Sequence, residues 1–147
     1  MAENNFEEFY GYAYEDLSEG QSAAYARTVT EADIVLFAGV SGDTNPVHLN
    51  EELAAASMFK GRIAHGMLSA AYISTVFGTR LPGPGCIYLS QTLKFKAPVR
   101  AGDTVVARVT VSSLVPEKRK AIFKTDCFVG ETLVLTGEAE IMVPARK

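Results

Sequence analysis

The second half of the chain carries apolar side chains at every second position, and this alternation restricts the possible folds more than any other feature. It runs through Thr104–Ser112, Lys120–Val129 and Thr132–Val143. A period of two is that of a β-strand with one buried face. Short turn sequences at Pro116–Lys118 and Gly130–Glu131 connect these strands, so neighbours should pair antiparallel. The side chains expected to point inward are Val105, Ala107, Val109, Val111, Ala121, Phe123, Thr125, Cys127, Leu133, Leu135, Ala139 and Ile141.

A further half-buried strand is expected from Cys86 to Lys96. Its apolar residues alternate with polar ones over the whole segment, which is typical of a strand with one face on the core. The inner face should carry Ile87, Leu89, Leu93 and Phe95. Residues 21–29 supply one more candidate strand.

The first half is predicted to be helical. Thr30 is a suitable N-cap, and acidic residues follow it in the first turn, where they favour a helix. This helix should end within Gly39–Gly42. A second helix should begin after Asn50, another N-cap, and continue to about Ser57.

A longer helix is predicted from Gly66 to Thr79, before a Pro- and Gly-rich turn. Small residues dominate one of its faces, and we expect the sheet to pack there; that face carries Met67, Ala70, Ala71, Ser74 and Gly78. The fold class is therefore α+β, with a curved antiparallel sheet around one long helix. No repeat or linker divides the chain, so residues 1–147 should form one domain.

Charge and composition exclude several classes of function. The chain has 14 Lys and Arg against 17 Asp and Glu, a net charge of −3, so nucleic acid is not an expected partner. No apolar run approaches the ~18 residues of a membrane span, and the N-terminus is acidic, so we expect a cytoplasmic protein without membrane attachment. Cys86 and Cys127 lack the spacing of metal ligands and should be free thiols.

The segment Ser41–His48 concentrates the residues suited to chemistry. His48, one of only two histidines, follows Asp43 by five positions among turn-forming residues, with Asn45-Pro46 between them. The other, His65, immediately precedes the long helix, whose unpaired N–H groups can receive an oxyanion. A solvated Asp–His pair at a helix cap, and a structural role for His65, are the alternatives.

Other site types fit these residues less well. A catalytic zinc site usually places its histidines at fixed helical spacings, which are absent here, so no metal is expected. A serine hydrolase needs a Gly-x-Ser-x-Gly turn, and Val40-Ser41-Gly42 lacks the first glycine in register. In Gly83-Pro84-Gly85, proline removes an N–H donor that a phosphate loop needs.

Two stretches resemble the MaoC-like, R-specific enoyl-CoA hydratases: residues 37–48 (Phe-Ala-Gly-Val-Ser-Gly-Asp-Thr-Asn-Pro-Val-His) and residues 63–67 (Ile-Ala-His-Gly-Met). The segment Phe95–Thr104 is also similar, so the resemblance covers nearly the whole chain. It implies a hot-dog fold, an acyl-CoA thioester substrate and a homodimer. It also implies no cofactor, because coenzyme A is part of the substrate.

The resemblance implies that Asp43 and His48 form the catalytic pair and that the Gly66 N–H binds the thioester carbonyl. Asn45, His65 and Ser74 are candidates for supporting roles. By charge alone, Lys94, Lys96 and Arg100 are candidates for binding coenzyme A. Three functions remain as alternatives: a hot-dog acyl-CoA thioesterase, a 3-hydroxyacyl-carrier-protein dehydratase and a non-catalytic acyl-binding subunit.

Overall fold

The computed structural model describes residues 5–147. In chain order the elements are η1 (Phe6–Phe9), η2 (Tyr14–Asp16), β1 (Ser22–Thr28), α1 (Glu31–Ser41), α2 (Pro46–Leu49), α3 (Glu51–Ala55), α4 (Gly66–Thr79), β2 (Ile87–Gln91), β3 (Lys94–Phe95), β4 (Thr104–Val115), η3 (Pro116–Lys118), β5 (Lys120–Val129) and β6 (Thr132–Met142). Among the described residues, no helix combines the length and apolar character needed to cross a bilayer.

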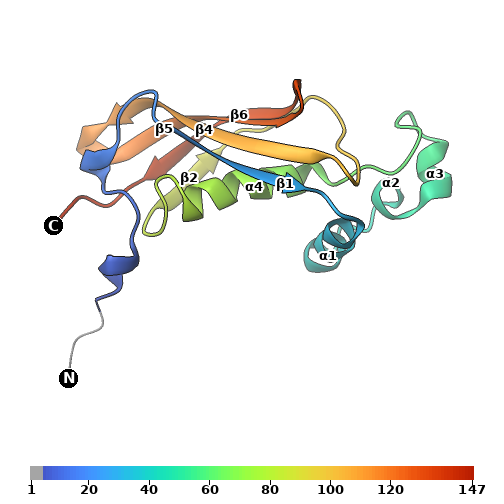
Figure 1. Ribbon diagram of the computed structural model, residues 1–147, viewed down its shortest axis with the longest axis horizontal. Coiled ribbons are helices and arrows are strands. Elements are labelled where there is room, and N and C mark those ends of the chain that lie inside the picture. Colours follow the sequence, from blue (N-terminus) through green and yellow to red (C-terminus); the bar gives the residue numbers. More distant parts are fainter. Residues whose placement is uncertain (1–4) are drawn as a thin grey trace.

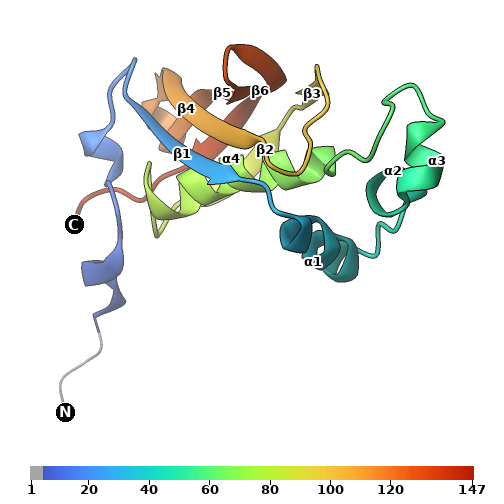
Figure 2. The ribbon, with the colours of Figure 1, turned by 45° about the vertical axis from the view of Figure 1, so that its right-hand side comes forward.

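The strands form one antiparallel sheet in the order β1-β4-β5-β6-β2, and β3 pairs with β6 on the same side as β2, nearer the start of β6. The sheet curves over α4, and α1, α2 and α3 lie beyond its end, beside the N-terminus of α4 (Figures 1 and 2). This is the predicted α+β arrangement, and the candidate strand at residues 21–29 is present as β1.

The alternation of β4 and β5 is confirmed. Their predicted inward side chains form the core against α4 and are at most 1% exposed. In β6 the agreement is incomplete, because the pairing with β5 shifts between Cys127 and Phe128. Val134 is consequently buried, whereas Leu133, which was predicted to be buried, is only partly so.

The prediction of one continuous strand from Cys86 to Lys96 is wrong. The segment is divided into β2 and β3, with an irregular register in β2. Between the two strands the Thr92 carbonyl oxygen comes within 1.8 Å of the point where a Cβ on Gly137 would lie. Only glycine permits this approach, which bends the chain towards β6. Of the apolar residues expected inside, Ile87, Leu89 and Phe95 are exposed, and Leu93 is partly buried.

The predicted packing face of α4 is also wrong. The sheet contacts the face that carries the larger side chains, Leu68, Tyr72, Ile73, Val76 and Phe77. Burying these side chains removes more apolar surface from water than burying alanine and glycine would. Most of the small-residue face therefore points away from the sheet, with Met67, Ala71, Ser74 and Gly78 exposed.

The predicted helices of the first half are confirmed. Thr30 caps α1 by accepting a hydrogen bond from the Asp33 N–H at 3.1 Å, and Asn50 caps α3 in the same way. The Ser41–His48 segment, expected to be a loop, also contains the four-residue helix α2. Asn45 caps this helix and Pro46 occupies its first turn, where proline costs no hydrogen bond.

Candidate active site

A cavity of about 470 Å³ opens between α2, the start of α4 and the segment that leads out of β3. Its volume lies within the usual range for small-molecule sites. Its walls are mostly apolar, and the polar side chains are those of two histidines, a serine and a lysine. The lining residues are His48, Met58, Phe59, Ile63, Ala64, His65, Gly66, Met67, Ser69, Phe95, Lys96, Ala97, Pro98, Val99, Val134 and Leu135.

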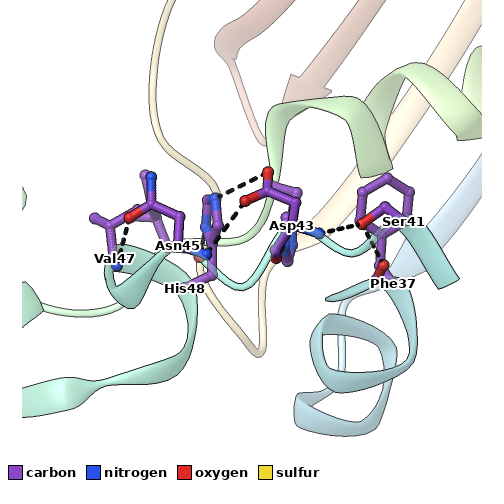
Figure 3. A network of polar contacts seen from close by, with 8 residues as sticks. Phe37, Ser41, Asp43, Asn45, Val47 and His48 are labelled. Atoms are coloured by element: carbon purple, nitrogen blue, oxygen red, sulfur yellow. Dashed lines mark hydrogen bonds and ion pairs between the residues drawn. The ribbon is translucent and has the colours of Figure 1, made fainter. Parts of the chain in front are cut away.

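Asp43 is held by local turns after α1. Gly42 ends that helix in the left-handed conformation, with φ of 77°. The Ser41 hydroxyl donates to the Phe37 carbonyl at 2.6 Å and accepts from the Asp43 N–H at 3.1 Å (Figure 3). Asp43 Oδ1 in turn accepts from the Asn45 N–H at 3.2 Å. The carboxylate thus has a fixed direction while its side chain remains 51% exposed.

His48 is placed by the cap of α2. The Asn45 side chain accepts from the Val47 N–H, which starts the helix and turns His48 inward (Figure 3). His48 Nδ1 lies 2.8 Å from the Ile63 carbonyl oxygen. A carbonyl can only accept, so Nδ1 carries the proton and Nε2 has a free lone pair.

That lone pair faces Asp43. His48 Nε2 and Asp43 Oδ2 are 4.0 Å apart, which is too far for a direct hydrogen bond. One small oxygen atom can contact both atoms at hydrogen-bond distance. The pair is therefore suited to holding a water molecule between a carboxylate and a basic nitrogen.

His65 lies directly behind this pair. Its ring stacks on that of His48, with centroids 3.8 Å apart and planes tilted by 26°, and its Nε2 lies 2.9 Å from the Asp43 carbonyl oxygen. One ligand atom from each of Asp43, His48 and His65 falls within 4.8 Å of the others, the proximity that a metal site needs. However, lone pairs lie in the imidazole planes, and those of two stacked rings do not converge on one point, so the geometry disfavours tetrahedral coordination.

Gly66 forms the first turn of α4 at the cavity wall. The first N–H groups of a helix have no partner within it, and the N-cap residue His65 makes no side-chain cap bond. A Cβ at Gly66 would lie 2.6 Å from two atoms of the Phe95 ring. Glycine therefore lets this positively polarised helix end form the wall beside Phe95.

The remaining predicted residues are dispersed. Ser74 lies on the exposed face of α4 and does not line the cavity. Lys96 lines the cavity, whereas Lys94 is exposed in β3 outside it. The Arg100 guanidinium donates to the carbonyls of Arg62 and Phe59, which ties it to the loop beside the cavity.

One contributing residue, Arg62, was not identified from the sequence. Its Nε donates to the His48 carbonyl at 2.6 Å, and its Nη2 bonds the Glu31 carboxylate at 2.6 Å. Arg62 thereby links α2 to the start of α1. A single arginine in a loop carries no signal that distinguishes it from a solvated surface residue.

Comparison with known proteins gives consistent matches. Residues 15–135 match the MaoC like domain. An (R)-specific enoyl-CoA hydratase of Rhodospirillum rubrum is 63% identical over 90% of this chain and 92% of its own length. A 3-hydroxybutyryl-CoA dehydratase of Methylorubrum extorquens is 48% identical over 91% of this chain and 85% of its own. The unliganded R-hydratase PhaJ1 of Pseudomonas aeruginosa superposes with a TM-score of 0.86 at 48% identity, covering 91% of this chain and 86% of that one.

Proposed function

The chain belongs to the MaoC-like domain family, and from this premise we propose that Asp43 and His48 add water to a trans-2-enoyl-CoA. The function is that of an (R)-specific enoyl-CoA hydratase, a hydro-lyase that forms (R)-3-hydroxyacyl-CoA reversibly. The observation that carries the residue assignment is the 4.0 Å gap between Asp43 Oδ2 and Nε2 of His48, a residue that lines the acyl-sized cavity.

The tautomer of His48 assigns it the role of base. Nδ1 is committed to the Ile63 carbonyl, so Nε2 accepts a proton as the water oxygen attacks C3. Asp43 holds the second hydrogen of the same water. The water O–H bond and the alkene π bond break, a C3–O bond and a C2–H bond form, and the proton taken from water returns to C2.

Attack at C3 moves negative charge onto the thioester oxygen. The Gly66 N–H, at the positive end of α4, is our candidate to receive that charge. Asp43 and His48 both come from the short segment formed by the end of α1 and α2 (Figure 3). Oxygen and proton therefore reach the alkene from one face, which is syn addition.

No further group is needed for this chemistry, and coenzyme A enters as part of the substrate. The family relationship supports an acyl-CoA thioester substrate, and Lys96, at the cavity, is the best placed of the predicted cations for its phosphates. A role in polyhydroxyalkanoate synthesis or fatty acid metabolism also fits this product. A cytoplasmic location stays a prediction.

A homodimer is also part of the proposal. Its support is the exposed small-residue face of α4 and the position of β2, which ends the strand order and leaves an edge for a second copy. Light scattering at low protein concentration is expected to give twice the 15.8 kDa of one chain. A particle of the monomer mass would contradict the dimer.

The residue assignment is tested with crotonyl-CoA by following loss of the enoyl thioester absorbance. We expect Asp43→Asn and His48→Gln each to lower turnover at least about 100-fold while remaining folded. Glu117→Gln, in η3 and outside the cavity, is the matched control and should keep wild-type turnover. Wild-type turnover in either folded site variant would eliminate the pair as the acid–base groups.

The three alternative functions can each be distinguished from the hydratase by a further measurement. A thioesterase would release thiol, which a disulfide reagent detects. If the protein is instead the proposed hydratase, no thiol is released and chiral analysis should find only the R product. A substrate carried by acyl carrier protein would react only when crotonyl carrier protein replaces crotonyl-CoA. A folded protein inactive on both substrates would favour the non-catalytic alternative.

A further inference from the structure

His65 is the most enclosed polar side chain at the site, yet the proposed chemistry gives it no step. It is 2% exposed, and its ring contacts those of Phe37 and His48. The Phe37 centroid is 4.9 Å away, and the His48 centroid is 3.8 Å away. Burying an imidazole this completely costs free energy unless its contacts compensate, so its contacts call for an explanation.

Those contacts reach both members of the pair in different ways. His65 Nε2 donates to the Asp43 carbonyl, which fixes the backbone that carries the carboxylate. The flat face of the ring lies against His48, so the His48 ring cannot turn away from its bond to Ile63. One side chain thus limits the movement of both groups that flank the 4.0 Å gap.

From these contacts we infer that His65 is a positioning residue that sets the distance between Asp43 and His48. The inference rests on the proposed function of that pair. A displacement of about 1 Å at a reacting group can reduce turnover about 100-fold, so a residue that takes no part in the bond changes can still control the rate.

The second ring nitrogen argues against a proton-transfer role for His65. Nδ1 is buried, and no hydrogen-bond partner for it is found in the described part of the chain. A proton added there would create a buried N–H without an acceptor, which is unfavourable. Since Nε2 is already occupied as a donor, His65 acts through its shape and one hydrogen bond.

Two substitutions separate these contributions. His65→Phe keeps a flat ring beside His48 and removes the donor to Asp43. His65→Gln keeps an N–H group for the Asp43 carbonyl and removes the ring. We expect each to lower kcat at least about tenfold with little change in KM, because the substrate still binds but the pair is misaligned. An unchanged kcat in a folded variant, or a change confined to KM, would overturn the inference.

The histidine tautomers provide a readout that does not depend on turnover. The chain has only two histidines, so long-range nitrogen–proton NMR spectra of the wild type can be assigned with the His65 variants. We expect the proton of His65 on Nε2 and that of His48 on Nδ1, and loss of the single His48 tautomer in His65→Phe. Finding His65 protonated on Nδ1 would overturn the inference even if a variant fails to fold.

The two proposals fail separately. If Asp43→Asn retains wild-type turnover, the proposed catalytic pair is wrong, whatever the His65 tautomer. If Asp43→Asn is inactive but the His65 variants retain kcat, the pair stands and the positioning role is wrong.

Discussion

Replacing Gly66 by alanine would test the crowded contact at the start of α4. The added Cβ would lie 2.6 Å from Cδ1 and Cε1 of Phe95, whereas ordinary contacts begin at 3.4 Å. One of the two groups must therefore move by almost 1 Å. The backbone of Gly66 is already helical, so the substitution introduces no dihedral strain.

The expected cost falls on catalysis more than on stability. Phe95 is 53% exposed, so its ring can swing outwards, and the ~1–3 kcal/mol typical of core overpacking is an upper limit. Alanine also recovers up to about 1 kcal/mol of helix propensity. We therefore expect a net loss below about 2 kcal/mol, or about 8 °C in Tm. Alanine keeps the backbone N–H proposed to receive the thioester oxygen, but its methyl group would crowd that oxygen. We expect kcat to fall, by no more than the about 100- to 1,000-fold that complete loss of such a donor costs.

The assay combines thermal melting with crotonyl-CoA turnover. Gly39→Ala is the matched control, because Gly39 lies in the exposed part of α1 and a Cβ there would meet nothing within 4 Å. It should raise stability by roughly 0.5–1 kcal/mol and leave turnover unchanged. If Gly66→Ala melts like the wild type and also hydrates at the wild-type rate, the helix end is not where the thioester carbonyl binds.

Three further substitutions or treatments have defined outcomes. Thr30→Ala removes the cap of α1 and should cost about 1 kcal/mol of unfolding free energy, measured by urea titration. The hydrogen bond from Arg27 lowers the pKa of Asp33, so this pair stabilises the fold above the unfolded-state pKa of about 3.9 and loses its effect as pH falls through the lower folded-state value. Arg27→Met should therefore destabilise at neutral pH and converge with the wild type in strong acid; a constant difference would refute the coupling. Burial raises the pKa of Cys127 to about 12, so its thiol should react with a disulfide reagent only after unfolding, and a fast native reaction would contradict its burial.

The fold could be predicted where the pattern of burial is local. In β4 and β5 every second side chain enters one core, and residue order alone specifies that set. The break between β2 and β3 could not be predicted in this way, because it depends on Gly137, far along the chain, being placed beside Thr92. The prediction of which face of α4 packs on the sheet was wrong for a different reason. Both of its faces are largely apolar, so periodicity did not show which one the sheet covers.

The candidate site likewise has a local part that could be predicted from the sequence and a long-range part that could not. Asp43, Asn45 and His48 lie within one short segment, and their turn and cap chemistry could be recognised from residue types. Further contacts that orient them come from residues 62–65. Arg62 bonds the His48 carbonyl, and Ile63 accepts from the His48 ring while its own N–H donates to Val47.

Segment 62–65 therefore adds long-range constraints to the geometry of the proposed catalytic pair. Its backbone is fixed on the opposite side by Ala64, whose N–H donates to the Val99 carbonyl at 2.6 Å. This bond connects the segment to the chain that leaves β3, so the position of the His48 ring depends on the sheet side of the cavity. A substitution that shifts Val99 should consequently lower kcat without touching Asp43 or His48. Local loop chemistry supplies the reactive groups, and long-range packing sets the distance between them.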